Sequence, residues 1–212
     1  MIEVRCVAFT ASALRDDIQS GRRAVSQIVG RDTAAMTDAE CARAAVESAA
    51  ENFSDGVVAP IFWFILFGLP GIIVYKAVNT ADSMIGHRTP RLKDFGWAAA
   101  RLDDLMNFVP ARLTALLFLT AGWAFDQREM VMRDAPGHRS WNAGWPEAAM
   151  AGVLGLALSG PRSYAGRVTP EPWLNAEGRT DPGPDDIEAA TMLTWRAWTI
   201  MFFTLCVLAV VT

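Results

Sequence analysis

Acidic, amide and arginine side chains recur between residues 47 and 112, on both sides of an apolar stretch that carries no charge. Ionisable side chains are costly beside lipid hydrocarbon, so their repeated placement at the border of such a stretch indicates a site. Carboxylates suit Mg²⁺, and arginine binds phosphate through two parallel hydrogen bonds. The side chains concerned are Glu47, Glu51, Asn52, Asp55, Asn79, Asp82, Asp94, Arg101, Asp103, Asp104 and Asn107.

The first polar group lies before the apolar stretch. Glu47, Glu51 and Asp55 are spaced by four residues, which places them on one helix face, with Asn52 beside them. Like charges at this spacing repel, and a bound cation would relieve the repulsion. The face is therefore a candidate for holding a metal–nucleotide complex. The alternative is a solvated helix face with Asp55 in its last turn.

The second polar group directly follows the apolar stretch. Asn79, Asp82 and Ser83 share a helix face, and His87 and Arg88 come soon after. Either a binding site or the polar end of a helix explains this pattern. In the second case Asp82 lies near a helix cap, and His87 is structural.

The third polar group pairs acids with an amide and an arginine. Asp103 and Asn107 are four residues apart, and Arg101 can pair with Asp104 three residues later. A phosphate site fits these residue types, and an interhelical salt-bridge network fits them equally well. Arg112, at the start of the next apolar segment, either binds phosphate or extends its charge to the membrane surface.

A later segment begins with Asn142 and continues through Pro146 to Glu147. Proline suits the first turn of a helix, and an acid suits the positive end of the helix dipole. Helix initiation therefore explains these residues without any function. The sequence contains no GxxxxGK[ST], which excludes a P-loop nucleotide site, and neither GxGxxG nor GxSxG occurs.

Four stretches are long and apolar enough to suggest a membrane protein. Residues 57–75 carry no charge, residues 105–125 carry only Arg112, and residues 148–161 and 197–212 carry none. A helical span needs about 20 apolar residues, so the last two would have to borrow flanking residues or insert partly. The prediction is an all-α, multi-pass integral membrane protein. A soluble helical bundle is the alternative.

The first apolar stretch is interrupted by Pro60 and by Gly68-Leu69-Pro70-Gly71. Such a cluster breaks a helix, so we expect two half-helices that form a re-entrant hairpin. Both flanks of a hairpin face one compartment, and arginines are abundant on both flanks. The positive-inside rule predicts that this compartment is the cytoplasm. The tryptophans fit anchoring at the membrane surface better than a cofactor site.

The remaining segments are predicted as cytoplasmic helices and connections. Residues 4–29 look helical, with a break at Gly21 and a stop at Gly30. The Thr37–Glu40 capping box predicts a helix from about Asp38 to Phe53 that ends at Ser54-Asp55-Gly56. Residues 126–147 and 162–188 are predicted as polar or loop-like connections, and all 212 residues as one domain.

Net charge and cysteine spacing argue against nucleic acid as a partner and against a cysteine metal site. The net charge of −4 argues against nucleic acid as a partner. Three scattered cysteines, Cys6, Cys41 and Cys206, have no metal-like spacing and indicate a reducing compartment. The N-terminus lacks the long apolar region of a signal peptide.

Several phrases in one order resemble the adenosylcobinamide-phosphate synthase family, CobD or CbiB. They are ESAAENFSDGVVAPIFW, GLPGIIVYKAVNTADSMIGHR, DFGWAAARLDDLMNFVPARLTALL, NAGWPEAAMAG and GPRSYAG. The resemblance covers about Leu14 to Gly166. It implies cobalamin biosynthesis by ATP- and Mg²⁺-dependent amide ligation of adenosylcobyric acid with aminopropanol or its phosphate ester.

The resemblance places the site in these motifs without assigning each role. As catalytic candidates it implies Glu47, Glu51, Asn52, Asp55, Asn79, Asp82, Arg101, Asp103 and Asp104. As substrate-binding candidates it implies Ser54, Ser83, Arg88, Asn107, Arg112, Asn142 and Glu147. The candidate metal ligands are Asp55, Asp82, Asp103 and Asp104.

The chain is similar to the C-terminal two-thirds of the family, which usually begins with further apolar segments. The expected location is the bacterial inner membrane, with lipid and other cobalamin-pathway proteins as further partners and the site facing the cytoplasm. Alternatives are a non-catalytic AmpE-like sensor or partner subunit, a truncated inactive homologue, and a channel or transporter that uses the broken helix as a pore.

Overall fold

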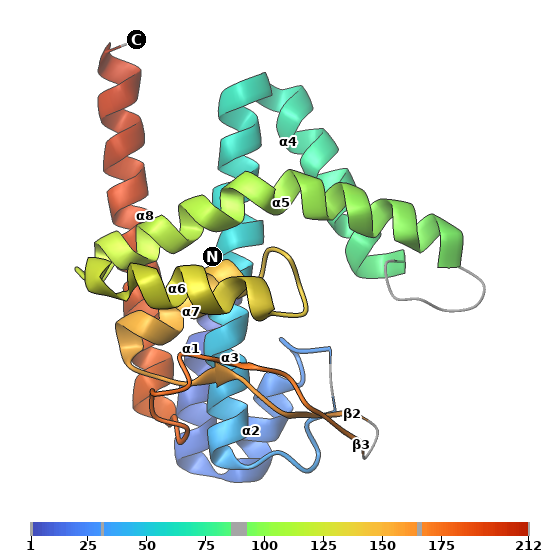
Figure 1. Cartoon of the computed structure of the whole chain (residues 1–212), viewed down its shortest axis with the longest axis vertical. Coiled ribbons are helices and arrows are strands. Elements are labelled where there is room, and N and C mark those ends of the chain that lie inside the picture. Colours follow the sequence, from blue (N-terminus) through green and yellow to red (C-terminus); the bar gives the residue numbers. More distant parts are fainter. Residues whose placement is uncertain (1, 31, 86–92, 165–166, 212) are drawn as a thin grey trace.

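The computed structural model describes residues 2–30, 32–85, 93–164 and 167–211, and helices dominate them (Figure 1). The helices before the central loop are α1 (Ile2–Asp16), α2 (Ile18–Val25), α3 (Asp38–Phe53), the π-helical turn η1 (Ser54–Val58) and α4 (Ala59–Ile85). Those after it are α5 (Lys93–Ala121), the short turns η2 (Phe125–Gln127) and η3 (Ala135–Gly137), α6 (Arg128–Asp134), α7 (Gly144–Leu154) and α8 (Pro184–Val211).

Two small antiparallel pairs complete the fold. Strand β1 (Leu158–Ser159) pairs with β4 (Trp173–Leu174), and β2 (Arg162–Tyr164) pairs with β3 (Arg167–Thr169). The chain between residues 162 and 188 is therefore not only a loop, since it contains three of these strands and the first turn of α8. The predicted all-α class is confirmed for the body of the molecule.

The helical N-terminal segment breaks earlier than predicted. Asp17 separates α1 from α2, and its carboxylate accepts hydrogen bonds from the backbone N–H groups of Gln19 and Ser20. Hydrogen bonds from Ser20 hold the pKa of Asp17 below its usual value. Gly21 lies inside α2, where an added Cβ would collide with Leu14. The predicted break at Gly21 is wrong because this glycine serves close packing rather than a turn.

The capping box is confirmed, but the predicted stop after it is wrong. Thr37 and Glu40 exchange both capping hydrogen bonds at the start of α3. The chain then continues through Ser54-Asp55-Gly56 as the π-helical turn, in which the N–H of Ala59 donates to the carbonyl of Ser54. Ser54 and Val58 are buried, so packing outweighs the low helix propensity of the glycine between them. Such turns occur frequently at functional sites.

The predicted hairpin is confirmed. Gly68 has φ 64° and ψ −148°, which divides α4 into two legs. Only glycine adopts this backbone readily, because a Cβ would be strained there. The chain turns back at this point and the second leg descends beside the first (Figure 1).

Three helices are long and apolar enough to cross a membrane, within Asp38–Met84, Gly96–Ala121 and Pro184–Val210. The apolar stretch that begins at residue 197 does borrow flanking residues, since its part up to Val211 forms the end of α8. Residues 148–161 do not form a span, because α7 has 11 residues and is largely buried. Residues 126–147 contain the short helix α6 and are thus more than a connection.

Candidate functional site

The phenol of Tyr75 forms the centre of a polar cluster at the base of the hairpin. Tyr75 is fully buried, and its ring packs with Ala59 and Met106. Its hydroxyl lies 2.9 Å from the carbonyl oxygen of Asp55 and 3.0 Å from Oδ1 of Asn107. The π-helical turn, the second leg of α4 and the middle of α5 are thus joined through one side chain.

Asp103 is held in place by two amides. Nδ2 of Asn107 donates to one carboxylate oxygen at 2.9 Å, and Nδ2 of Asn79 donates to the other at 3.3 Å. Lys76 Nζ in turn donates to Oδ1 of Asn79 at 3.2 Å. These bonds fix the rotamer of Asp103, while each carboxylate oxygen keeps a further acceptor position. The polar cluster comprises Asp55, Tyr75, Lys76, Asn79, Asp103 and Asn107.

Further carboxylates surround the polar cluster. Asp55 is close enough to Glu51, Asp103 and Lys76 for electrostatic interaction. Asp103 is similarly close to Asp82 and Asp104. Five acids from four elements, α3, η1, α4 and α5, therefore share one region, with Lys76 as the cation within the cluster. This excess of negative charge favours binding of a cation.

The polar cluster suits Mg²⁺ that is bound by few protein ligands together with water and substrate phosphates. Within the described ranges, no group of three or more His, Cys, Asp or Glu side chains is placed to hold a metal ion. Mg²⁺ commonly uses one or two carboxylates, several waters and the phosphates of a substrate. The oriented Asp103 carboxylate fits this way of binding Mg²⁺. The assignment of Asp55, Asp82, Asp103 and Asp104 as metal ligands stays a prediction.

A pocket on another side of α5 combines arginine with tryptophan. It has a volume of about 190 Å³ and is lined by Trp97, Ala100, Arg101, Asp104, Arg139, Ser140 and Trp141. Arg101 pairs with Asp104 at 3.2 Å, and its guanidinium lies 4.8 Å from the Trp141 ring centre. Two arginines line this cavity, one paired with Asp104 and the other 3.8 Å from Glu171, and arginine side chains can bind an anion. We call this the arginine pocket.

Arg112 does not line the arginine pocket. Its NH1 donates to the carbonyl of Phe108 at 2.6 Å and to Oδ1 of Asn142 at 3.3 Å. The guanidinium also lies against the rings of Phe108 and Trp145. Nδ2 of Asn142 donates to the carbonyl of Asp104 at 2.8 Å. Arg112 and Asn142 therefore join α5 to the segment before α7.

Comparison with known proteins agrees with the sequence interpretation. The family model described as CobD/Cbib protein matches residues 4–194. The chain belongs to the CobD/Cbib family. That range includes every residue of the polar cluster and of the arginine pocket.

Relatives in the CobD/Cbib family are similar over almost the whole chain. A "Cobalamin biosynthesis protein CobD" of Rhodobacter capsulatus is 55% identical over 195 residues, which is 92% of this chain and 62% of the relative. Proteins of the same name from Brucella suis and Rhizobium meliloti are 52% and 51% identical, over 62% and 61% of their lengths. The chain thus spans less than two-thirds of these relatives. No solved structure matches it.

In this CobD/Cbib family member, several predicted site residues lie outside the polar cluster. Glu47 is buried and accepts a hydrogen bond from the N–H of Ser159 at 2.8 Å. Glu147 is buried beside His138, with 3.5 Å between Oε2 and Nε2. Their contacts join separate elements, so the structure gives both acids a packing role. Their predicted part in chemistry stays a prediction.

The smaller polar residues also have local partners. Nδ2 of Asn52 donates to the hydroxyl of Ser48, and the hydroxyl of Ser83 donates to the carbonyl of Asn79. Ser54 is buried in the π-helical turn. Arg88 and the Asp94 side chain lie outside the described residues. The structure therefore brings Asp55, Asn79, Asp103 and Asn107 together, and the functional roles of all the predicted site residues stay predictions.

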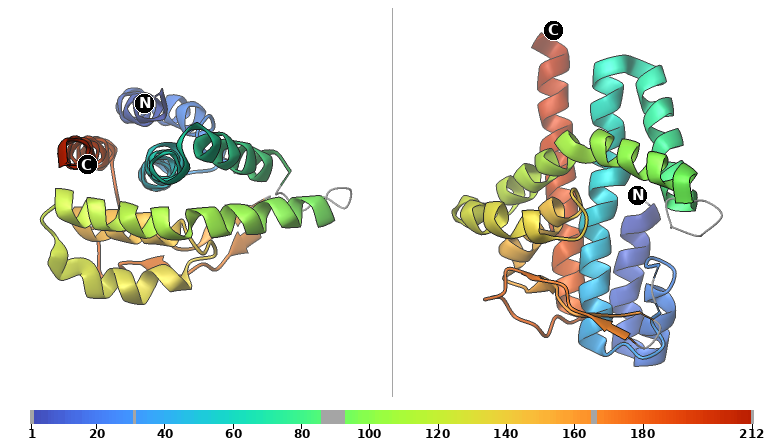
Figure 2. Two further views of the ribbon diagram at one scale, coloured as in Figure 1. Left: turned by 90° about the horizontal axis from the view of Figure 1, so that it is seen from above. Right: turned by 45° about the vertical axis from the view of Figure 1, so that its right-hand side comes forward.

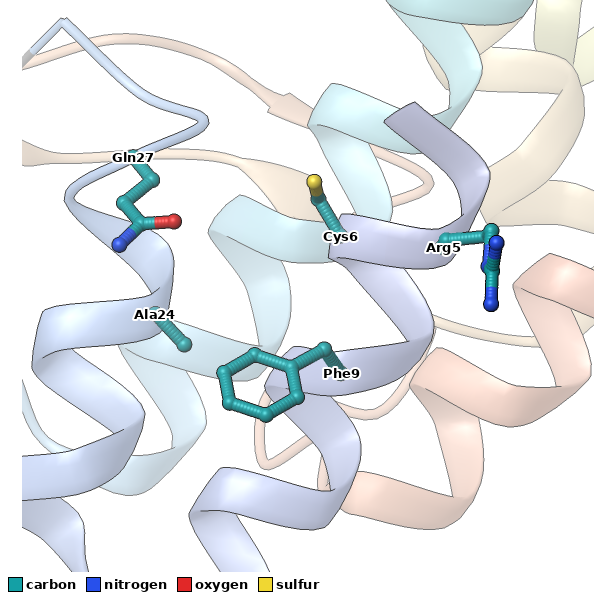
Figure 3. Close-up of a pocket in the computed structure, with 5 residues that line it drawn as sticks. All are labelled: Arg5, Cys6, Phe9, Ala24 and Gln27. Atoms are coloured by element: carbon teal, nitrogen blue, oxygen red, sulfur yellow. The ribbon is translucent and has the colours of Figure 1, made fainter. Parts of the chain in front are cut away.

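Sequence reasoning missed Tyr75, Lys76 and the segment Arg139-Ser140-Trp141. Tyr75 and Lys76 precede Asn79 by four and three residues, so helix spacing could have placed them on its face. No local pattern marks residues 139–141, which reach α5 only through the fold. A second pocket, of about 270 Å³ and lined by Arg5, Cys6, Phe9, Ala24 and Gln27, contains no predicted site residue (Figure 3).

Proposed function

We propose that this chain takes part in cobalamin biosynthesis by ligating adenosylcobyric acid to aminopropanol or its phosphate ester, using ATP and Mg²⁺. The family membership and the names of the relatives support the pathway. The observation that carries the chemistry is the polar cluster, in which two amides orient Asp103 beside other carboxylates. We further propose a location in the bacterial inner membrane, with the site open to cytoplasmic ATP.

The polar cluster would hold the nucleotide. Carboxylate activation transfers a phosphoryl group, which requires positioning and neutralisation of charge. Mg²⁺ would supply part of that neutralisation when bound. Asp103 would provide an oxygen ligand in a fixed orientation, and Lys76 lies at the edge of the same network as a positive group. Asp55 and Asp82 are the nearest additional carboxylates for metal binding or for accepting the proton of the amine.

The arginine pocket would hold a phosphate of a substrate. Arg101 has one carboxylate partner in Asp104, and the pocket also offers Arg139 and the Ser140 hydroxyl. Trp97 and Trp141 line the same pocket. Because Asp104 borders both sites, the pocket lies next to the polar cluster, as a two-substrate ligation requires.

The test is ATP-dependent amide formation in membranes from a strain that lacks its own ligase. We expect Asp103→Asn to abolish most turnover and the exposed Asp126→Asn, as a matched control, to leave it unchanged. Binding of Mg²⁺-ATP to the purified chain is measured in parallel. Binding without turnover by the unsubstituted chain would favour a non-catalytic partner subunit. Loss of neither binding nor turnover in Asp103→Asn would overturn the site assignment.

A further inference from the structure

The exposed apolar side chains gather on three parts of the molecule. The tip of the hairpin exposes Phe67 and Leu69, and the end of α8 exposes Phe203 and Val207, all above 60%. Helix α5 exposes a third set, of which Leu105 at 72% is the largest. Monomeric soluble proteins rarely show so much contiguous apolar surface. Something apolar must cover these three parts.

The three parts do not run in the same direction. Seen from above, α8 and the first leg of α4 are viewed along their axes, whereas α5 lies lengthwise (Figure 2). The side view agrees, since the hairpin tip and the end of α8 project on the same side of α5 (Figure 1). A bilayer that α8 and the hairpin enter end-on would therefore meet α5 along its length.

Helix α5 has the pattern of a helix that lies on such a surface. Leu105, Val109, Leu113 and Leu116 are exposed at spacings of four, four and three residues, which is one helix face. The opposite face is buried against the protein, including Met106, Asn107, Ala111, Thr114 and Phe118. We call the exposed set the α5 stripe.

The depth available to the hairpin agrees with this placement. Gly68 lies eight residues before Lys76, so the tip reaches about 12 Å beyond that charge at 1.5 Å per residue. The hydrocarbon core is about 30 Å thick, so the hairpin enters only one leaflet. Trp63 on the first leg donates its Nε1–H to the carbonyl of Met106 on α5. The middle of α5 therefore lies near the base of the hairpin.

Residues that prefer the membrane surface occur beside the apolar parts of α8 and α5 in the sequence. The last charge in α8 is Arg196, which lies between Trp195 and Trp198 and is followed by a charge-free end. On α5, Arg101 precedes the α5 stripe, and Arg112 lies within its length, between Val109 and Leu113. Tryptophan and arginine are enriched where hydrocarbon meets headgroups. Lipid accounts for all three apolar parts with one surface, whereas a protein partner would have to cover each separately.

We propose that α5 does not cross the membrane but lies flat at its surface, with the α5 stripe in lipid. The hairpin tip and the end of α8 descend from that level into the hydrocarbon. Lying flat is typical of an amphipathic interfacial helix. The polar cluster then sits at headgroup level, where water-soluble and membrane-bound molecules can both reach it. This proposal does not depend on the ligase function.

Spin-label depth measurements in lipid vesicles test the proposal. Single cysteines replace Leu105, Val109, Leu113, Leu116 and Leu69 in a chain whose Cys6, Cys41 and Cys206 are alanine. The exposed Arg128 on α6 provides the water-exposed control position. We expect oxygen access and nearly equal depth along the α5 stripe, with Leu69 about 10 Å deeper, as the helix rise implies. A spanning α5 would instead change depth by about 16 Å from Leu105 to Leu116.

Each other outcome overturns the proposal. A steady change of depth along the stripe means that α5 spans the bilayer. Exclusion of both oxygen and a nickel reagent means that protein covers the stripe, and nickel access means that water does. Oriented-bilayer ¹⁵N NMR on the unsubstituted chain avoids any effect of the cysteines on folding. There, α5 signals in the range of in-plane helices and α8 signals in the transmembrane range support the proposal, and α5 signals in the transmembrane range refute it.

Discussion

The polar cluster and the Arg112 junction each hold a charged side chain of α5 through an asparagine, yet they differ in the other partners of that charge. In the polar cluster, Asn107 and Asn79 hold a carboxylate whose oxygens can accept further ligands. In the junction, Asn142 and two aromatic rings surround a guanidinium that also donates to a backbone carbonyl. A carboxylate with open acceptor positions suits binding, whereas a guanidinium packed against two rings and an asparagine suits assembly of the fold.

Removal of the Asp103 charge should produce the largest change. Asp103→Asn keeps the shape but loses the anion that the two amides orient. We expect ligation to fall by about 10²-fold or more, which corresponds to a lost transition-state interaction of about 3 kcal/mol. Turnover in membranes measures this, with Asp126→Asn as control. Normal complementation of a ligase-deficient strain by Asp103→Asn would place the chemistry elsewhere.

Removal of the Tyr75 hydroxyl should damage the polar cluster indirectly. Tyr75→Phe keeps the packing with Ala59 and Met106 but leaves the carbonyl of Asp55 and Oδ1 of Asn107 without this donor. We expect the free energy of unfolding to fall by about 1–3 kcal/mol, the usual cost of leaving buried groups unsatisfied. Thermal unfolding in detergent measures it. An unchanged midpoint would mean that the hydroxyl does not hold the three elements together.

Arg101→Lys should show whether Arg101 binds substrate phosphate or serves only as the structural partner of Asp104. Lysine keeps the charge but loses the planar fork that binds phosphate through two bonds. We expect KM for the phosphorylated substrate to rise about tenfold, which corresponds to a loss of about 1.4 kcal/mol in binding. We expect kcat to change little. Steady-state kinetics with aminopropanol and with its phosphate ester make the comparison. Equal KM values for substituted and unsubstituted chains would leave Arg101 as a structural partner of Asp104.

Arg112→Lys should have the smallest effect and the opposite profile. Lysine can still reach the carbonyl of Phe108, but it cannot cover two rings and bind Asn142 together. We expect a loss of about 1 kcal/mol in stability, in the range of exposed cation–π contacts, with no change in KM. Unfolding and kinetics of the same preparation check both statements. A raised KM in Arg112→Lys would assign phosphate binding to the junction and remove the contrast with Arg101.

Local chemistry at single residues made part of this fold predictable. Gly68 marks the hairpin because only glycine adopts its positive φ without strain, and Thr37 with Glu40 marks a helix start because their bonds are local. Spacing by four residues also predicted that Asp103 and Asn107 meet, and they do.

Only the tertiary structure decided which polar side chains meet one another and which ones contact the backbone of a distant element. The sequence gives Glu47 and Asp103 the same charge, but burial turns Glu47 toward the backbone of Ser159 while Asp103 faces amides from two helices. The helix runs through Ser54-Asp55-Gly56 because neighbouring helices bury that turn, against its local propensity. Contacts between elements distant in sequence carry no local pattern, so composition and spacing cannot state them. The sequence by itself determined the family and the broken apolar hairpin, whereas packing decided which of the polar residues between 47 and 112 lie together.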